Sequence, residues 1–360
     1  MIYIIYTLII LFLLYLDRQL PVLNKTIRFL IPCVYILLIG LRGNHVGVDT
    51  PTYYQHYYMY GRFGCHYIEQ GFDWVNRFCF AQKWLHYTFF TFCAAMAILP
   101  TAIAAEKRLG KNAYSIFILL LCSTTFVMLC NGMRQGIACG LFFYLIMLYE
   151  DENIGTYKKF PLFVIGILFA SLFHASIFMV CPLFLLKYVH LSNKTYKLLY
   201  ILSFVFVFIN ISSLIPHMEI GTRSYDYTGK MMNSEASLLG FSANTIKNIS
   251  LLILLLRARL FEKYRLIANM TYFSMIINNM GYHIPLMSRI SMYFTFINIM
   301  MMAIVLANKD IRNNAQTRTC VWVMFSLVVV LNVYGIISPT NRVLPYKFWW
   351  ECSGFPTHIL

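Results

Sequence analysis

Charge is scarce in this chain, and acidic residues are the rarer kind. Only 12% of the 360 residues are charged, 14 of them acidic and 29 basic, whereas a soluble domain carries about 25% charged residues. A chain this poor in charge and 59% hydrophobic is a polytopic membrane protein. The net charge of +15 resembles that of a nucleic-acid binder, but the basic residues lie mainly in short connections and form no basic face, so we expect no nucleic-acid partner.

Motifs for metal chemistry are missing as well. The ten cysteines are scattered singly without a CxxC pair, and the chain has no DxD pair and no HExxH run. We therefore expect no metal and no cofactor. Only Cys65 and Cys79 share a polar loop, which leaves a disulfide there as an alternative. The first apolar run has no basic residues before it and no small-residue cleavage site, so it predicts an uncleaved first helix with its N-terminus outside.

About twelve apolar runs follow one another along the chain. A helix needs about 20 residues to cross a membrane, and several runs are shorter, so residues 160–188 form either two crossings or one long tilted helix. The runs are 2–16, 27–41, 84–104, 113–130, 133–149, 160–173, 175–188, 196–215, 241–256, 266–284, 287–307 and 319–337. The sequence predicts an all-α bundle of 11–12 transmembrane helices in a single membrane domain, residues 1–360.

Basic residues distinguish the two sides of the membrane. If 160–188 crosses twice, most of the arginines and lysines between runs gather on one side, which is then the cytoplasm. The polar loops 42–83 and 216–240 and the tail 338–360 lie on the outer face. The unusual polar residues of the chain all fall on that face, so we expect the functional site there.

The first outer loop places a charged pair around two glycines, from Arg42 to Asp49. Glycine lets the backbone turn closely around a ligand, and the planar guanidinium of Arg42 suits phosphate oxygens. We predict a diphosphate site here; a structural Arg42–Asp49 ion pair is the alternative. The tyrosine-rich stretch 53–60 is typical of membrane-interface anchoring or of sugar contact. Residues 69–74 then predict a helix lying on the membrane surface.

Arg134 stands where two apolar runs meet with almost no spacer. A helix start favours anions through its free N–H groups and its dipole, and Arg134 adds a formal charge at that place. The alternatives are snorkelling to the interface or pairing with an acid such as Asp49. His174 lies in a break of small residues, where an imidazole either packs structurally or takes a proton from a hydroxyl.

Two further arginines fall on the outer side. Arg289 and Tyr293 are four residues apart, one helical turn, so both are expected to reach one ligand. Arg223 lies in the 216–240 loop, whose composition suits either a lid over a polar substrate or an ordinary exposed loop.

These residues occur in an ordered series that resembles the EpsG-type branch of the Wzy-like polysaccharide polymerases. The series spans nearly the entire chain, and its pieces are Leu41 to Asp49, Glu69-Gln70-Gly71-Phe72, Met133-Arg134-Gln135, Ala170 to Ser176, Arg289 with Tyr293-Phe294, and Leu344 to Phe348. Val48 departs from the pattern, because threonine is more usual there; the change removes a hydroxyl from the loop.

The resemblance implies an enzyme of the bacterial inner membrane, a glycosyltransferase acting in O-antigen, capsule or exopolysaccharide synthesis. Such an enzyme joins oligosaccharide repeat units carried on undecaprenyl diphosphate at the outer, periplasmic face, with a chain-length regulator and a flippase as partners. Such a glycosyl transfer requires that the negative charge of the leaving diphosphate be stabilised and that the acceptor hydroxyl lose its proton. We expect Arg42, Arg134 and Arg289 to bind the diphosphates and His174 or Asp49 to be the base. Substrate contacts are further expected from Gln135, Arg223, Tyr293 and Tyr346.

Two other classes stay open at this point. Another glycosyltransferase that uses polyprenyl-phosphate sugars, or a membrane acyltransferase, would also use an outer-face acid and a histidine. A transporter or flippase for a lipid-linked oligosaccharide would bury arginines in a bundle too, although no internal repeat of the kind common in transporters is present.

Overall fold

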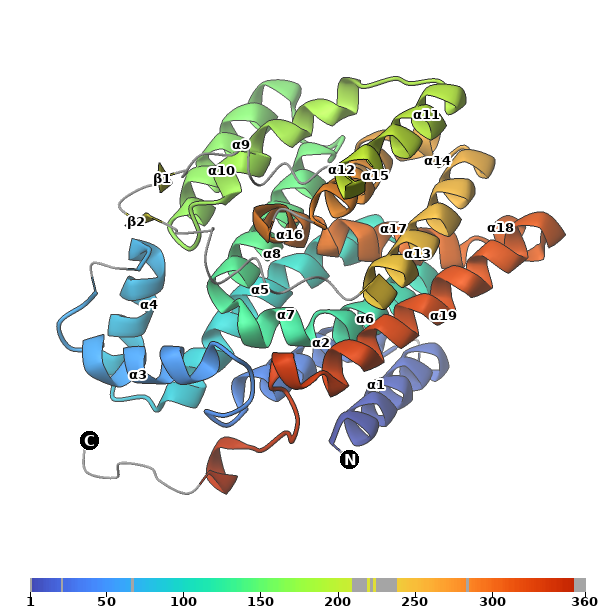
Figure 1. Cartoon of the computed structure of the whole chain (residues 1–360). Coiled ribbons are helices and arrows are strands. Elements are labelled where there is room, and N and C mark those ends of the chain that lie inside the picture. Colours follow the sequence, from blue (N-terminus) through green and yellow to red (C-terminus); the bar gives the residue numbers. More distant parts are fainter. Residues whose placement is uncertain are drawn as a thin grey trace. The chain divides into compact units, whose positions relative to one another are not determined.

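Helices form nearly all of the chain that the structure describes (Figure 1). The computed structural model describes residues 2–20, 22–65, 68–208, 219–220, 223–224, 238–282 and 285–352. Within these ranges the only strands are β1 (Glu219–Ile220) and β2 (Arg223–Ser224), which pair antiparallel inside the 216–240 loop. The all-α prediction is therefore confirmed. Helices suit these apolar runs because a helix satisfies its own backbone polar groups within lipid.

Four helices of the described chain are long and apolar enough to cross a membrane. These are α1 (Ile2–Gln19), α5 (His86–Arg108), α13 (Leu238–Arg257) and α19 (Ala315–Ile337). Shorter apolar helices include α8 (Met133–Tyr149) and α17 (Thr295–Ala307). Helix covers most of the described part of every predicted apolar run. Length and composition mark only four of these helices as spans, so the count of 11–12 stays a prediction.

The run 160–188 is not one long helix. Helix α9 (Thr156–Ser171) ends in a tightened turn, and α10 (Ile177–Val180) begins after it and continues as the 3₁₀ helix η1 (Cys181–Tyr188). The amide of Phe173 donates to the carbonyl of Ala170 at 3.0 Å, an i to i−3 bond that closes the last turn. The alternative of a single tilted helix is therefore wrong, because the small and polar residues between the two halves form a turn.

The chain divides into two compact units, one of residues 1–181 and 332–360 and the other of residues 182–331. We call them unit 1 and unit 2. The prediction of a single membrane domain stays a prediction. Besides α1, α5 and α8–α10, unit 1 holds α2 (Asn24–Gly40), α3 (Thr50–Tyr60), α4 (Gln70–Ala81), α6 (Lys111–Thr124), α7 (Phe126–Asn131), and the 3₁₀ helices η3 (Pro339–Asn341) and η4 (Trp349–Glu351).

Close backbone approach holds α5 and α8 together at the core of unit 1. A Cβ atom on Gly140 would lie 2.1 Å from the carbonyl oxygen of Ala97, so only glycine permits this crossing. Phe90, Ile98 and Phe143 are completely buried in the same core. Small residues at a crossing are the usual way in which membrane helices pack closely.

The two ends of unit 1 carry different chemistry. At one end the Tyr3 hydroxyl donates to the Val343 carbonyl at 3.0 Å, so the start of α1 lies beside the C-terminal tail. At the other end the guanidinium Nε of Arg28 lies 3.0 Å from the Asp17 carboxylate, and Lys111 donates to the carbonyl of Asp17 at 2.9 Å. Two of the loops predicted for one side of the membrane, those at Asp17–Arg28 and at Lys111, thus lie together, as the charge pattern indicated. Which end faces the cytoplasm stays a prediction.

Unit 2 is held by a buried amide network. Its elements are η1 beyond Cys181, α11 (Asn193–Ser203), α12 (Val205–Phe208), β1, β2, α13, α14 (Leu260–Lys263), α15 (Arg265–Met280), α16 (Pro285–Met292), α17, α18 (Lys309–Asn313) and α19 to Leu331. The Asn269 side chain donates to the carbonyls of Leu186 at 2.8 Å and Val189 at 3.0 Å and accepts from the Tyr196 hydroxyl at 2.5 Å. A buried amide satisfied in this way fixes its neighbours firmly.

Candidate functional site

Three predicted motifs of unit 1 meet at one carboxylate, that of Glu69. The guanidinium Nη1 of Arg134 donates to Oε2 of Glu69, and the imidazole Nδ1 of His174 lies 2.9 Å from Oε1. Each of the three side chains is about one-fifth exposed: Glu69 21%, Arg134 22% and His174 19%. The structure therefore brings Arg134 and His174 together through an acid that lies 65 and 105 positions away from them along the chain.

Gly71 determines how closely the Glu69 motif approaches the His174 motif. Glu69 immediately precedes α4, and the Gly71 amide in the first turn of that helix donates to the Leu172 carbonyl at 2.8 Å. A helix start leaves its first N–H groups without partners, and a helix end leaves carbonyls without partners. Here a free N–H at the start of α4 bonds a free carbonyl in the turn after α9. This contact places Glu69 beside His174.

Arg134 occupies the first turn of α8, as the sequence predicted. Helix α7 ends at Asn131, Gly132 breaks the helix, and α8 begins at Met133. Tyr53 of α3 is buried and hydrogen-bonds the Arg134 side chain. Nε of Arg134 is buried and has no partner among the described residues. The guanidinium is thus held on one side by Tyr53 and Glu69, and it keeps one N–H donor that no described residue uses.

Electrostatics keep Glu69 ionised at neutral pH. Burial by itself would raise the pKa of the Glu69 carboxyl, but the hydrogen bond from His174 and the positive charge of Arg134 outweigh it and lower that pKa to about 2. Because an ionised carboxylate only accepts hydrogen bonds, Nδ1 of His174 carries the proton in their contact. Nε2 is then the imidazole nitrogen that takes up a proton.

Sequence reasoning missed Glu69 as a site residue. An acid was considered as a partner for Arg134, but the acid weighed was Asp49, whereas the structure pairs Arg134 with Glu69. The sequence does contain a signal for a role of Glu69, because Glu69 is the first residue of the motif Glu69-Gln70-Gly71-Phe72. From the sequence we predict a surface helix there and include the motif in the family series, but we give Glu69 no role in the site. Helix α4 does form there, and its position at the membrane surface stays a prediction.

Arg42 is completely buried and its bonds go to the protein. Nε donates to the Thr50 hydroxyl at 3.0 Å, Nη1 donates to the Ile39 carbonyl at 2.6 Å, and the guanidinium carbon lies 4.8 Å from the centre of the Phe90 ring. Nη2 has no partner among the described residues. A direct contact between Arg42 and a diphosphate stays a prediction, and it requires this packing to open.

The C-terminal tail covers the Arg42 loop. The Gly43 amide donates to the Lys347 carbonyl at 2.8 Å, and the Trp349 amide donates to the Leu41 carbonyl at 3.0 Å. Tyr346, a predicted substrate contact, donates its hydroxyl to the Leu38 carbonyl at 2.6 Å and is half-buried. The predicted outer loop and the tail therefore form one structure at the same end of unit 1.

Asp49, at the start of α3, closes the same loop. The Val48 amide donates to the Asn131 side-chain oxygen at 2.7 Å, which joins this loop to the break before Arg134. Gln135 is buried beside Arg134 in α8. The loop and the helix break thus lie together, and the roles of Asp49 and Gln135 stay predictions.

The remaining predicted site residues belong to unit 2. Helix α16 ends at Met292, one residue before Tyr293. The expectation that Arg289 and Tyr293 share one continuous helix is therefore wrong. The Tyr293 amide donates to the Ile290 carbonyl at 3.1 Å in a turn before α17, and its ring is fully buried. Arg223 lies in β2, and its side chain is outside the described part of the structure. The convergence of these residues with Arg134 stays a prediction.

The disulfide alternative is settled, and two tyrosines of the 53–60 stretch are placed, while the role of the rest of that stretch stays a prediction. Cys65 and Cys79 are both free thiols, so they form no disulfide. Tyr53 and Tyr57 are buried, with the Tyr57 ring stacked on Phe89 at a centroid distance of 5.3 Å. These two tyrosines therefore serve the packing of α3 rather than exposed contacts with lipid or sugar.

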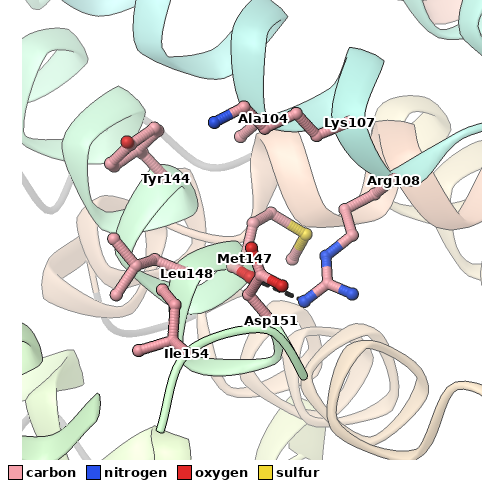
Figure 2. A pocket seen from close by; sticks show the side chains of 8 residues that line it. All are labelled: Ala104, Lys107, Arg108, Tyr144, Met147, Leu148, Asp151 and Ile154. Carbon is pink, nitrogen blue, oxygen red and sulfur yellow. Dashed lines mark hydrogen bonds between the residues drawn. The ribbon is translucent and has the colours of Figure 1, made fainter. Parts of the chain in front are cut away.

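Glu69, Arg134 and His174 together form what we call the Glu69 cluster. A small pocket, shown in Figure 2, lies at the other end of α8, where Met147 and Leu148 line it. It encloses about 100 Å³, and Figure 2 shows Lys107, Arg108 and Asp151 around it, with Arg108 donating to the Met147 carbonyl at 2.9 Å. Thirteen residues of helix separate Arg134 from Met147, which is about 20 Å. The Glu69 cluster, rather than this pocket, unites the predicted motifs.

Metal ligands do not gather in the described ranges. No group of three or more His, Cys, Asp or Glu side chains there is arranged to hold a metal ion. The expectation of a reaction without metal or cofactor stays a prediction.

An apolar helical chain in which Arg134, His174 and Glu69 meet in one partly exposed ionic cluster is a membrane protein with a candidate polar site. The chain belongs to the EpsG family, whose model matches residues 25–348, nearly the whole chain. This is a family related to the Wzy-like polymerases, and the resemblance found in the sequence is thereby confirmed. No curated protein and no solved structure matches the chain.

Proposed function

We propose that this protein is a polysaccharide polymerase that joins undecaprenyl-diphosphate-linked oligosaccharide repeat units by glycosyl transfer at the outer face of the bacterial inner membrane. Family membership supports a glycosyltransferase-like polymerase. The observation that carries the proposal is the joining of Arg134 and His174 through Glu69. One group suits an anion and the other moves a proton, and both lie at the start or end of a helix rather than deep within a bundle.

In the proposed reaction the acceptor hydroxyl oxygen bonds to the anomeric carbon of the donor sugar while the bond from that carbon to the diphosphate breaks. The hydroxyl proton passes to Nε2 of His174, and Glu69 stabilises the resulting imidazolium. Undecaprenyl diphosphate leaves with its electron pair, held by the Arg134 guanidinium and the start of α8. Arg42, Arg289 and Tyr293 are proposed to help bind the two carriers, with Gln135, Arg223 and Tyr346 as further contacts.

Complementation of a deletion strain tests this function. Wild-type protein should restore polymer, while Arg134→Ala and His174→Ala should leave single lipid-linked repeats on the outer face, with protein levels unchanged in the membrane fraction. Removing one such charge-stabilising group costs about 10²- to 10³-fold in rate. Arg108→Ala and His190→Ala are matched controls, because each of these side chains lines a different pocket.

The outcome separates the alternative classes. Lipid-linked repeats trapped on the inner face would indicate a transporter, and full-length polymer lacking a decoration would indicate an acyltransferase. Normal chain lengths in both cluster variants would overturn the assigned roles.

A further inference from the structure

Glu69 binds both functional side chains at once, one with each oxygen. A carboxylate on Arg134 fills a place that suits a phosphate oxygen, since guanidinium pairs with either anion. We propose that Glu69 is a displaceable counter-anion: the diphosphate of the lipid carrier replaces it on Arg134, and Glu69 then serves His174 alone. This inference rests on the proposed function and makes Glu69 a positioning residue for it.

The surroundings of Arg134 favour such an exchange. Its side chain and that of Glu69 are 22% and 21% exposed, so both partners are accessible. A diphosphate carries more negative charge than a carboxylate, and the positive end of the α8 dipole favours the more highly charged anion. The buried Nε of Arg134, with no partner among the described residues, offers a donor that Glu69 leaves unused. A phosphate group has more acceptor oxygens than a carboxylate and is able to use that donor.

Displacement of Glu69 from Arg134 changes how readily the Glu69–His174 pair takes up a proton. While Arg134 holds Glu69, its positive charge offsets the carboxylate that faces His174. Once the diphosphate takes over Arg134, the uncompensated carboxylate favours an imidazolium, so His174 accepts the acceptor's proton more readily when a donor is bound. The other charged or titratable groups in this region are Asp49, Tyr53 and His56 at α3 and Asp73 in α4. Tyr53 and His56 both interact with the charge of Arg134, Asp49 acts on Tyr53, and Asp73 acts on His56.

The exchange therefore couples two events at the site. A lipid-linked donor on Arg134 makes the base effective, and without a donor the base is restrained by the Glu69–Arg134 pair. The physical basis is the sharing of one carboxylate between a guanidinium and an imidazole.

Binding of farnesyl diphosphate, a short isoprenyl diphosphate, tests this inference on the full purified chain in detergent. Glu69→Gln removes the competing charge, so the variant should bind the probe about 3- to 10-fold more tightly than wild type, because a partly exposed ion pair contributes about 1 kcal/mol and 1.4 kcal/mol is tenfold. The same variant should lose at least about 10-fold in polymer formation, because His174 loses its ionic partner. Glu351→Gln is the matched control and should change neither quantity, since Glu351 bonds the Phe348 amide in the tail.

Proton uptake by the wild-type protein provides a second measurement that needs no Glu69 variant. Calorimetry of probe binding in two buffers of different ionisation enthalpy should show uptake of a fraction of one proton near pH 7, and His174→Gln should abolish that fraction. Equal or weaker probe binding by Glu69→Gln, or the same proton count in wild type and His174→Gln, overturns the inference. A deletion strain that still makes polymer overturns the proposed function instead, and tighter binding by Glu69→Gln would then still show the counter-anion role.

Discussion

The amide of Gly71 donates a hydrogen bond to the carbonyl of Leu172 at 2.8 Å, across 101 positions of the chain. Glu69 lies two residues before this contact and His174 two residues after it, so one backbone hydrogen bond fixes the separation of the acid and the imidazole. The cluster is therefore only as well ordered as the contact between the start of α4 and the end of α9.

Gly71→Ala should separate these two motifs. An added Cβ would lie 2.8 Å from the Leu172 Cβ and 2.9 Å from its carbonyl oxygen, so the backbone must shift. We expect a loss of polymer of at least about 10-fold, because catalytic geometry tolerates little displacement, with the protein still present in the membrane. Gly110→Ala is the control, since a Cβ there meets nothing within 4 Å. Full activity in Gly71→Ala would show that this approach is dispensable.

Arg134→Lys tests whether the planar guanidinium, with its several N–H donors, matters as well as the positive charge. Lysine keeps the positive charge at the start of α8 but is unable to bond Glu69 and Tyr53 in the same geometry or to grip two phosphate oxygens at once. We expect polymer formation to fall to roughly a tenth or less of wild type, measured as chain length on gels. Arg77→Lys, an exposed position on α4, should behave as wild type. Rescue by Arg134→Lys would reduce the role of Arg134 to a point charge.

Glu69 should also make stability depend on pH in the acid range. Its folded-state pKa of about 2 lies below the ordinary value of 4.5, so the stabilisation from its ionised form is complete above about pH 4.5 and lost as the pH falls toward 2. The melting temperature of wild type should therefore exceed that of Glu69→Gln by a constant amount at pH 6–7, and the gap should shrink below pH 4.5. A gap that widens on acidification would contradict the ionised state of Glu69.

The sequence predicted the helices well because each depends on local information. Length and apolarity predict where a helix forms, and charge in the short connections predicts which loops lie together; Asp17, Arg28 and Lys111 do meet at one end of unit 1. Arg134 at the start of α8 follows equally from the short break at Gly132. These features need only neighbouring residues.

Pairing between distant motifs was not predictable in the same way. The Glu69–His174 contact depends on a glycine that lets two helix ends touch, and the sequence alone does not reveal which ends meet. Arg42 has an arginine's usual polarity, yet the structure buries it beneath Phe90 and the tail. Tyr293 follows Arg289 at helical spacing, but α16 ends between them. Tertiary packing decided each of these outcomes.

Trp349→Ala should loosen the tail over the Arg42 loop. The Trp349 ring stacks on the Tyr87 ring at a centroid distance of 4.3 Å. The Trp349 backbone amide also donates a hydrogen bond to the Leu41 carbonyl. Loss of a stacked aromatic pair costs about 0.5–1.5 kcal/mol beyond its buried area, so we expect a lower melting temperature and faster tryptic cleavage after Arg42. Trp322→Ala is the control, because that side chain is 63% exposed on α19. Unchanged cleavage would show that the backbone bonds of the tail suffice.

Reporter fusions test the orientation on which the proposed reaction depends. The Arg28–Asp17–Lys111 end of unit 1 is expected in the cytoplasm because basic loops are retained there, which places the Glu69 cluster and the tail outside. Alkaline phosphatase, active only outside the cytoplasmic membrane, should therefore be active when fused after Gly64 or Asn341 and inactive when fused after Asn153. The Asn153 fusion, in the turn between α8 and α9, is the internal control. The reverse pattern would put the cluster on the cytoplasmic side, where it has no access to repeat units displayed on the outer face, and would remove the polymerase mechanism while leaving the fold unchanged.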